Sequence, residues 1–270
     1  MKRLILVTTL SLLVIYIIGF LMIYIFQEQF IFLDDDLSED YVYQFEKPFE
    51  EVDLKNGKAD LNGLYFPVES AKGAIVYFHG NRGNLTRWGE VIQPFVQMGY
   101  AVLVMDYRGY GKSTGKRTKK ALLNDAQLWY DWLNEKYKQE EIIIYGRSLG
   151  TGIASWLASQ NKPDKLLLET PYYSLAEMAK RYYPIYPARY ALRFNFESFR
   201  YLRAVKCPVY MFHGTDDSVV PYQQGKRLYE SMLNPEGRFY TIEGGEHKNL
   251  IEFEDFREAV RVTLNKGFLE

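Results

Sequence analysis

The chain has 270 residues, of which 47% are hydrophobic and 25% are charged. This composition is typical of one globular domain with a sizeable core and excludes a disordered or fibrous chain. The 33 lysine and arginine residues nearly balance the 34 aspartate and glutamate residues, so no overall positive field favours nucleic acid, and we expect no nucleic-acid partner. Cys207 is the only cysteine, which excludes an intrachain disulfide and a cysteine-rich metal site.

An uncharged apolar run extends from Leu4 to Phe26, directly after Lys2 and Arg3. A helix of its 23 residues is about 35 Å long and can cross a hydrocarbon core of about 30 Å. A cleaved signal peptide has a shorter apolar region, of about 7–15 residues, followed by small residues, whereas bulky residues follow here. We therefore predict that residues 1–26 form a signal anchor, a single-pass transmembrane helix.

The charges on either side of this run predict its orientation. Lys2 and Arg3 precede it, and three aspartates follow at positions 34–36. Because cytoplasmic segments next to a span carry the excess of positive charge, we expect residues 1–3 in the cytoplasm and the later residues on the extracytoplasmic side, periplasmic or extracellular. Residues 27–48 then form a juxtamembrane connector, whose aromatic residues suit either the membrane interface or core packing.

Residues 49–270 have the pattern of a mostly parallel sheet with helices on both faces. Phe49–Leu54 and Ala59–Phe66 alternate apolar and polar residues around an Asn-Gly turn, which predicts an antiparallel hairpin. Later apolar runs alternate with helical stretches, as in βαβ units of an α/β fold. The expected strands are Ala74–Phe78, Ala101–Met105, Glu141–Tyr145, Lys165–Leu168, Val209–Phe212 and Arg238–Ile242, and the expected helices are Leu85–Met98, Lys119–Lys138, Leu149–Asn161, Tyr222–Leu233 and Asn249–Asn265.

Residues 171–203 interrupt this alternation with a segment rich in tyrosine, phenylalanine and proline. The interruption falls at the edge of the sheet where ligands bind in open α/β folds, and long insertions in compact domains are usually functional. We interpret the segment as a cap over the site, with a packed structural excursion as the alternative. Its aromatic rings, held near a bilayer by the anchor, favour an apolar acyl chain as ligand.

The pentapeptide Gly146-Arg147-Ser148-Leu149-Gly150 follows a β-branched run and precedes a helical pattern. This order of strand, turn and helix is typical of a nucleophile elbow, in which a sharp turn exposes a serine hydroxyl at the edge of the sheet. Glycine is expected at 146 and 150 because a side chain there would collide with the neighbouring strand or helix. A tight turn without catalysis is the simpler interpretation of the pentapeptide alone.

A serine hydroxyl becomes a nucleophile when a histidine takes its proton and a carboxylate orients the histidine. Of the three histidines, only His247 follows both Ser148 and a plausible acid, as the order serine, acid, histidine requires. The acid is expected just after the strand Val209–Phe212, where we choose Asp217 and keep Asp216 as the alternative. The oxyanion needs two backbone N–H donors. One is expected from Leu149, the residue after the nucleophile.

The second oxyanion donor is expected from Asn81, in the glycine-rich loop that follows the strand Ala74–Phe78. A glycine-rich turn without this role is the alternative. This chemistry requires neither a metal nor an organic cofactor. The segment Gly111-Lys112-Ser113 predicts no nucleotide site, because a phosphate loop needs glycine five positions before Gly111 and Asp106 stands there.

Five ordered motifs carry a resemblance to a known family. They are Phe78-His79-Gly80-Asn81, Asp106-Tyr107-Arg108-Gly109-Tyr110-Gly111, Gly146-Arg147-Ser148-Leu149-Gly150, His213-Gly214-x-x-Asp217-x-x-Val220-Pro221 and Gly245-Glu246-His247. From about Phe49 onward the chain resembles the membrane-anchored serine hydrolases of the α/β-hydrolase superfamily, including the depalmitoylase-like branch. The resemblance implies the α/β-hydrolase fold, Ser148 as nucleophile, Asp217 as acid, Asn81 as second oxyanion donor, and a supporting role for His79 in the oxyanion loop. The tyrosine-rich insert departs from the family pattern.

We therefore predict a membrane-anchored serine hydrolase that cleaves acyl esters or thioesters through an acyl-enzyme, with a small-molecule or lipid-like acyl substrate. A serine peptidase of the same superfamily is the first alternative, since it uses the same triad. The second alternative is a non-catalytic binding or scaffold protein with a hydrolase fold, because a fold does not imply a function.

Overall fold

An eight-stranded sheet forms the centre of the domain, with the order β1-β2-β4-β3-β5-β6-β7-β8. The structure, a computed structural model, describes residues 1–232 and 236–265. The strands are β1 (Glu50–Asn56), β2 (Ala59–Phe66), β3 (Ala74–Phe78), β4 (Ala101–Met105), β5 (Ile142–Arg147), β6 (Lys165–Glu169), β7 (Val209–Gly214) and β8 (Gly237–Ile242). β2 is antiparallel to β1 and β4, and the other neighbours are parallel. The expected mostly parallel sheet is confirmed.

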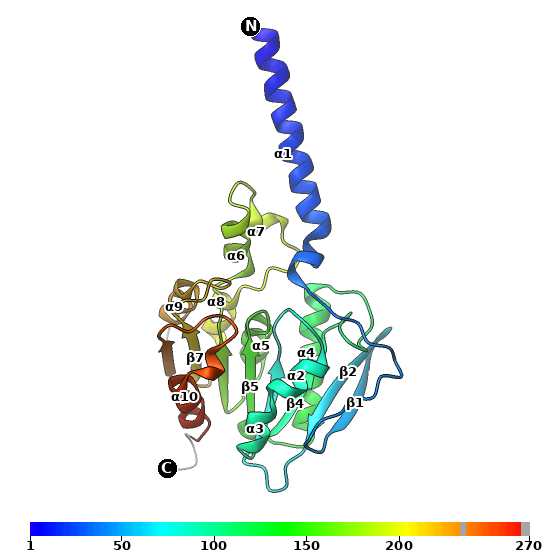
Figure 1. The fold of residues 1–270 in the computed structure, drawn as a ribbon, viewed down its shortest axis with the longest axis vertical. Coiled ribbons are helices and arrows are strands. Elements are labelled where there is room, and N and C mark those ends of the chain that lie inside the picture. Colours follow the sequence, from blue (N-terminus) through cyan, green and yellow to red (C-terminus); the bar gives the residue numbers. More distant parts are fainter. Residues whose placement is uncertain (233–235, 266–270) are drawn as a thin grey trace.

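Helices cover both faces of this sheet (Figure 1). They are α2 (Leu85–Val91), α3 (Gln93–Gln97), α4 (Lys119–Asn134), α5 (Gly150–Gln160), α9 (Tyr222–Glu230) and α10 (Glu254–Asn265), with 3-10 turns at Gln139–Glu141, Leu202–Ala204 and Leu250–Glu252. α4, α5 and α9 contribute buried residues to the core on one face, and α2, α3 and α10 to the core on the other. The C-terminal ends of the parallel strands therefore stay open for a site.

Several expected boundaries differ from those observed. The helix expected at Leu85–Met98 is divided into α2 and α3, because Pro94 has no N–H to bond the carbonyl four residues earlier. The last helix begins at Glu254 after a 3-10 turn, so its expected start at Asn249 is wrong. The hairpin forms, but its two-residue loop is Gly57-Lys58, with Gly57 at a φ of +65°. Leu233, the end of one expected helix, lies outside the described residues, as do residues 266–270.

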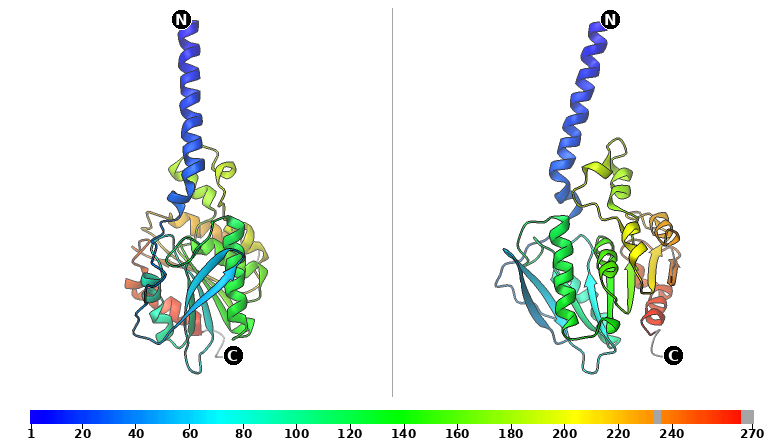
Figure 2. Two further views of the ribbon diagram at one scale, coloured as in Figure 1. Left: turned by 90° about the vertical axis from the view of Figure 1, so that its right-hand side faces the viewer. Right: turned by 180° about the vertical axis from the view of Figure 1, so that it is seen from behind.

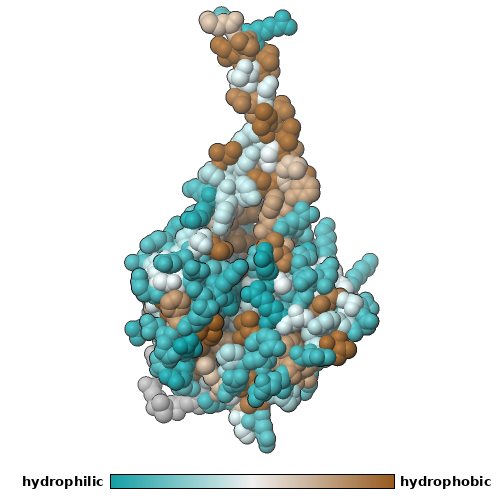
Figure 3. Space-filling model, viewed as in Figure 1, coloured by the Kyte–Doolittle hydropathy of each residue, from teal (hydrophilic) through white to brown (hydrophobic). Residues whose placement is uncertain are grey.

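The N-terminal helix α1 (Lys2–Ile31) projects from the domain as a single long rod (Figures 1 and 2). Its most apolar 18-residue window has a mean hydropathy of 2.7, and none of that window is buried. Figure 3 shows hydrophobic residues along most of this helix, in contrast to the largely hydrophilic surface of the domain. The helix is long and apolar enough to cross a membrane, and it continues five residues past the expected end at Phe26.

The first part of the expected connector is therefore helical, and the rest packs on the domain. Phe32 and Tyr43 are buried. The Phe32 ring lies 4.9 Å from that of Phe194, and the Tyr43 hydroxyl donates to Asn62 at 3.0 Å. For these two aromatic residues core packing is the observed arrangement, whereas Phe30 remains exposed.

The insert 171–203 holds three short helices, α6 (Leu175–Tyr182), α7 (Ala188–Ala191) and α8 (Ser198–Tyr201). Its two ends are part of the core, since Tyr172 and Phe196 are buried. Its middle, from α6 to α7, rises beside the lower part of α1 in the views of Figures 1 and 2. The ends of the segment, called the cap below, therefore pack in the core and its middle lies beside α1, while its role as a cap over the site stays a prediction.

Candidate active site

Ser148 lies on the sharp turn between β5 and α5, with a φ of +51° that a residue with a side chain rarely adopts. Its N–H donates to the Glu169 carbonyl at 2.9 Å and its carbonyl accepts from the Thr151 N–H at 3.0 Å. The turn is therefore held by hydrogen bonds to β6 and to α5. A Cβ at Gly146 would lie 2.7 Å from the Cβ of Ala154, and one at Gly150 would overlap the Phe78 carbonyl. The expected need for glycine at both positions is confirmed.

The structure brings together the three side chains expected to form a triad. The Ser148 Oγ lies 2.9 Å from Nε2 of His247, and Nδ1 of His247 lies 2.8 Å from Oδ2 of Asp217. Asp216, the alternative acid, is exposed and bonded to Thr215. The two loops meet because Gly214, at the end of β7, lies against the backbone of Gly245.

The Asp217 carboxylate is buried and stays ionised through its hydrogen bonds. Burial alone would raise the pKa of this carboxyl, but hydrogen bonds from His213 and His247 and from the Val220 N–H lower it to about 2. The N–H groups of Val219 and Val220 donate to Oδ1 at 2.9 and 2.7 Å. Oδ2 is thereby left to accept from Nδ1 of His247, which holds the imidazole with Nε2 facing Ser148.

The two expected oxyanion donors flank Ser148. Leu149 caps the N-terminus of α5. The Asn81 carbonyl accepts from the Leu33 N–H and the Tyr110 hydroxyl, each at 2.8 Å, and its side chain donates to the Ile31 carbonyl at 3.1 Å. Among the described residues, neither the Asn81 N–H nor the Leu149 N–H donates to a protein acceptor. Both remain available to a ligand oxygen.

His79 and Asp106 support the oxyanion loop from below. His79 is fully buried, with Nδ1 2.6 Å from the Gly80 carbonyl and Nε2 3.4 Å from Oδ1 of Asp106. Oδ2 of Asp106 accepts from the Leu85 N–H at the start of α2. Burial raises the pKa of Asp106, and His79 opposes that rise. Among the described residues, the Ser148 hydroxyl bonds His247 and His79 bonds the Gly80 carbonyl, in agreement with the supporting role that the resemblance implies for His79.

Arg147, the variable residue of the pentapeptide, has a role that the sequence pattern did not indicate. Its Nε lies 3.1 Å from Oε1 of buried Glu169, whose other oxygen accepts from Tyr145 at 2.7 Å. Its guanidinium also donates to the Lys248 carbonyl at 3.3 Å, one residue after His247. Arg147 thus connects the nucleophile turn to the histidine loop. No spacing rule marks such a residue, because its partner carbonyl belongs to a loop 101 positions away.

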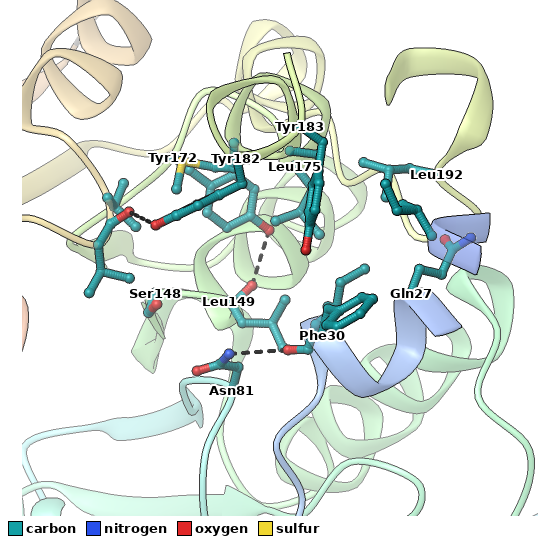
Figure 4. A pocket seen from close by; sticks show the side chains of 16 residues that line it. Gln27, Phe30, Asn81, Ser148, Leu149, Tyr172, Leu175, Tyr182, Tyr183 and Leu192 are labelled. Carbon is teal, nitrogen blue, oxygen red and sulfur yellow. Dashed lines mark hydrogen bonds between the residues drawn. The ribbon is translucent and has the colours of Figure 1, made fainter. Parts of the chain in front are cut away.

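A cavity of about 360 Å³ adjoins Ser148, and its walls are mostly apolar. Figure 4 shows side chains from three parts of the chain pointing into it. α1 contributes Ile23, Gln27, Phe30 and Ile31, the cap contributes Leu175, Met178, Ala179, Tyr182, Tyr183 and Leu192, and Asn81, Leu149, Tyr172, Val219 and Val220 complete the lining. Nothing in the sequence indicated that the N-terminal helix forms part of this wall.

A second cavity, of about 230 Å³, shares Ser148, Asn81 and Val219 with the first but has a different chemistry. Four cations line it, namely Arg82, Arg87, Arg147 and Lys248. Arg147 is paired with Glu169, whereas in the described part of the chain no carboxylate lies within 4.0 Å of the other three. Burial and the positive charges of Arg147 and Arg82 lower the pKa of Arg87. This cavity favours a negatively charged group.

Comparison with known proteins identifies the family. A family model described as "Serine aminopeptidase, S33" matches residues 69–195. An uncharacterized protein of Mycobacterium tuberculosis is 31% identical over 212 residues, which cover 76% of this chain and 75% of that protein. The chain belongs to the α/β-hydrolase superfamily. The resemblance to its serine hydrolases is thereby confirmed at the level of the superfamily.

Relatives with a named activity match over a smaller part of their length. The lysophosphatidylserine lipase ABHD12 of Danio rerio is 34% identical over 184 residues, which cover 60% of this chain and 48% of the lipase. This chain therefore spans about half the length of that relative. Among solved structures, the esterase Pf2001 of Pyrococcus furiosus has a TM-score of 0.68 at 19% identity, covering 87% of this chain and 95% of the esterase. That likeness confirms the α/β-hydrolase fold.

Proposed function

We propose that this protein is a membrane-anchored serine hydrolase that cleaves acyl esters of amphiphilic lipids with an anionic head group. One observation carries the proposal: the Ser148 hydroxyl lies where an apolar cavity and a cationic cavity meet. An ester bond placed at this serine has room for an alkyl chain on one side and for a charged alcohol moiety on the other. The name of the ABHD12 relatives, lysophosphatidylserine lipase, supports a substrate of this kind.

The proposed reaction uses Ser148, His247 and Asp217 as a catalytic triad. The Oγ of Ser148 attacks the acyl carbonyl while Nε2 of His247 takes its proton, and the N–H groups of Leu149 and Asn81 stabilise the oxyanion. The tetrahedral intermediate collapses, the alcohol leaves with the proton from His247, and an acyl-enzyme remains. Water then attacks the acyl-enzyme with the same proton transfers, releasing the fatty acid and restoring Ser148. Asp217 keeps the imidazole in the tautomer with its proton on Nδ1.

The apolar cavity is the proposed acyl site. Each methylene group moved from water into such surroundings contributes about 0.8 kcal/mol, and this contribution increases with chain length until the cavity is full. Tyr183 from the cap lies beside Phe30 from α1, with the ring centroids 6.3 Å apart, and Tyr182 lies on the other side of the cavity, where its hydroxyl donates to the Val219 carbonyl (Figure 4). An acyl chain in this cavity would contact the aromatic carbon of these rings, which favours methylene groups over polar substituents.

An aminopeptidase, as the name of the matching family model would suggest, fits these cavities poorly. The charged ammonium group at a peptide's N-terminus needs an acidic or carbonyl-rich partner. Of the described residues that line the two cavities, none is aspartate or glutamate, and the charged ones in the second cavity are cations. Ester hydrolysis is therefore the better-supported activity, and peptide hydrolysis is tested against it below.

The membrane anchor in this proposal is α1, followed by the connector from Phe32 to residue 48 and the catalytic domain from residue 49. Support comes from the apolar length of the helix and from its exposed sides. We further propose that the catalytic domain lies on the extracytoplasmic side, as the positive charges before the helix and the aspartates after it favour.

The central experiment uses the purified full chain in detergent micelles. Ser148→Ala is expected to abolish labelling by a fluorophosphonate probe and to lower ester hydrolysis by about 10⁴-fold or more. Ser70→Ala, at an exposed serine far from the C-terminal ends of the strands, is the matched control and should retain both. Labelling of Ser148→Ala, or turnover of short peptides with no hydrolysis of acyl esters, would reject the proposed function.

A further inference from the structure

The cap contacts α1 in the middle of its apolar run. The Tyr186 ring lies 5.0 Å from that of Tyr16 and 6.2 Å from that of Phe20. The Tyr16 hydroxyl donates to the Ile185 carbonyl at 3.1 Å, and the Tyr186 hydroxyl occupies the space that a side chain at Gly19 would fill. These contacts place the tip of the cap alongside the membrane-crossing segment.

The depth of this contact follows from the helix rise. Gly19 and Tyr16 precede Phe26, the last residue of the uncharged run, by 7 and 10 positions, or about 10 and 15 Å along the axis. A hydrocarbon core is about 30 Å thick. If α1 spans a bilayer, the cap tip beside Tyr16 lies well below the level of the head groups and cannot be in water.

Three polar contacts, from two residues of α1, join residues 191–193 of the cap to this helix. Gln27 is only 2% exposed, and its amide donates to the Ala191 carbonyl at 3.2 Å while its oxygen accepts from the Arg193 N–H at 2.7 Å. Glu28 forms an ion pair with Arg193 at 3.1 Å. Because separating the cap from α1 would leave the Gln27 amide without these partners in apolar surroundings, which is costly, the contacts hold the cap and the helix together.

Two large side chains of the cap, between α6 and the end of α7, are exposed on its surface. Ile185 is 67% exposed and Tyr190 is 83% exposed. Hydrocarbon suits the isoleucine side chain, and the head-group boundary suits tyrosine. Arg189, which lies between them in sequence and is also exposed, has a stem long enough to bring its guanidinium to the head groups.

We propose that residues 182–191 are inserted into the membrane leaflet nearest the catalytic domain, so that the apolar cavity receives its acyl chain directly from hydrocarbon. The inference rests on the proposed function, since it requires α1 to span the bilayer and the cavity to hold an acyl chain. The cavity lies between the two inserted elements, with Ile23 and Phe30 of α1 on one side and Tyr183 and Leu192 of the cap on the other. A lipid in that leaflet would not need to enter water before its ester reached Ser148.

The test measures how deeply the cap lies in a bilayer. The full chain with Cys207→Ser receives one new cysteine, Ile185→Cys, and is labelled with an environment-sensitive fluorophore in phosphatidylcholine vesicles. Leu13→Cys on α1 is the positive control, and Glu69→Cys, in the loop between β2 and β3 at the opposite end of the sheet, is the negative control. Lipids with a nitroxide on the acyl chain should quench the label at 185 nearly as strongly as that at 13, and leave that at 69 unquenched.

Each outcome decides the inference separately from the proposed function. Quenching at 185 no stronger than at 69, with strong quenching at 13, overturns membrane insertion of the cap, whatever the activity. No quenching at 13 would overturn insertion together with the membrane anchor of the proposed function. Quenching at 185 in a protein that hydrolyses no ester supports insertion and rejects the proposed function. If the label at 185 reported the same apolar environment with and without lipid, protein and not the bilayer would be shielding it. That result would also overturn insertion.

A kinetic experiment adds a second readout. Ile185→Ser combined with Tyr190→Ser changes two side chains that do not line either cavity at Ser148. We expect kcat/KM for a long-chain ester embedded in vesicles to fall about tenfold, because the apolar surface that stabilises the inserted cap is lost. Hydrolysis of water-soluble p-nitrophenyl acetate should be unchanged. Equal effects on both substrates would contradict the inference.

Discussion

The Nδ1 atom of His247 lies 2.8 Å from Oδ2 of Asp217, and the other oxygen of that carboxylate accepts two backbone N–H groups. Because the two carboxylate oxygens have different partners, the position of the carboxylate and the tautomer of the imidazole are both fixed. Asp217→Asn is therefore expected to lower kcat by about 10⁴-fold, because an amide can present its N–H to the ring and stabilise the wrong tautomer. Asp216→Asn, at the exposed neighbour, is the matched control and should retain activity within about twofold. Equal losses of kcat in the two variants would show that the assignment of Asp217 as the acid is wrong.

The same carboxylate predicts a pH dependence of stability. The pKa of Asp217 is about 2 in the folded protein against an ordinary value of 3.8, so the folded state binds fewer protons and its stability is greatest above pH 3.8. As the pH falls through 3.8 towards 2, the free energy of unfolding should lose about 2 kcal/mol from this group. Denaturant unfolding in detergent at pH 6 and pH 2 measures the loss. Asp217→Asn should reduce the difference between the two pH values by that amount, and Asp216→Asn should not.

The acyl site predicts a chain-length series. For p-nitrophenyl esters, kcat/KM should rise from acetate to about octanoate, as each buried methylene adds binding in the transition state. Tyr182→Ser and Tyr183→Ser should flatten this rise and leave acetate turnover largely intact, because both side chains line the cavity. Tyr186→Ser is the comparison, since that ring contacts α1 instead. A preference for acetate would reject the cavity as an acyl site.

The cationic cavity predicts a head-group preference. Arg82→Gln with Arg87→Gln should raise KM for lysophospholipids with an anionic head group about tenfold, a loss of about 1.4 kcal/mol, and should leave an uncharged acyl ester unaffected. The difference in KM between the double variant and the unaltered protein should become smaller in high salt, because exposed charges are screened. Arg261→Gln, at an exposed position of α10, is the control. An equal rise of KM for charged and uncharged esters would show that the two arginines maintain the loop without recognising charge.

The orientation of the anchor predicts the location of the domain. A reporter fused to the C-terminus that is active only in the cytoplasm should give no signal in a bacterial host, and one that is active only outside the cytoplasm should give signal. Substituting Lys2→Glu and Arg3→Glu should weaken this bias, because those cations are the ones expected to stay inside. Cytoplasmic activity of the unaltered fusion would reject the orientation.

Local chemistry explains which features could be predicted from the sequence. The elbow at Ser148 is encoded within a few residues, since Gly146 and Gly150 sit where a Cβ would overlap the chain, and the strands were visible as apolar runs. The place of Pro94 in its helix was also readable, although the break it causes was missed. The triad roles remain proposals, but the order of Ser148, Asp217 and His247 in the chain was enough to select side chains that the structure brings within hydrogen-bond distance.

Features that depend on contacts between distant segments were not predictable. Gln27 is a polar residue after an apolar run, and its burial depends on bonds to Ala191 and Arg193, which lie 164 and 166 positions later. The four cations of the second cavity come from the loop after β3, helix α2, the end of β5 and the loop after β8. No periodicity or motif links such residues, because only the folded arrangement of the sheet edge brings them together.

The lining of the apolar cavity by Ile23, Phe30 and Ile31 bears on how the enzyme can be studied. A soluble version made by deleting the N-terminal helix would also delete one wall of the acyl site, and would expose the apolar side of the cap that rests on it. Such a shortened protein would hydrolyse short esters with altered selectivity and would misreport the preference of the full chain. Exchanging this helix for an unrelated anchor would likewise change which substrates the enzyme accepts. The same 30 residues thus determine both the location of the protein and its selectivity.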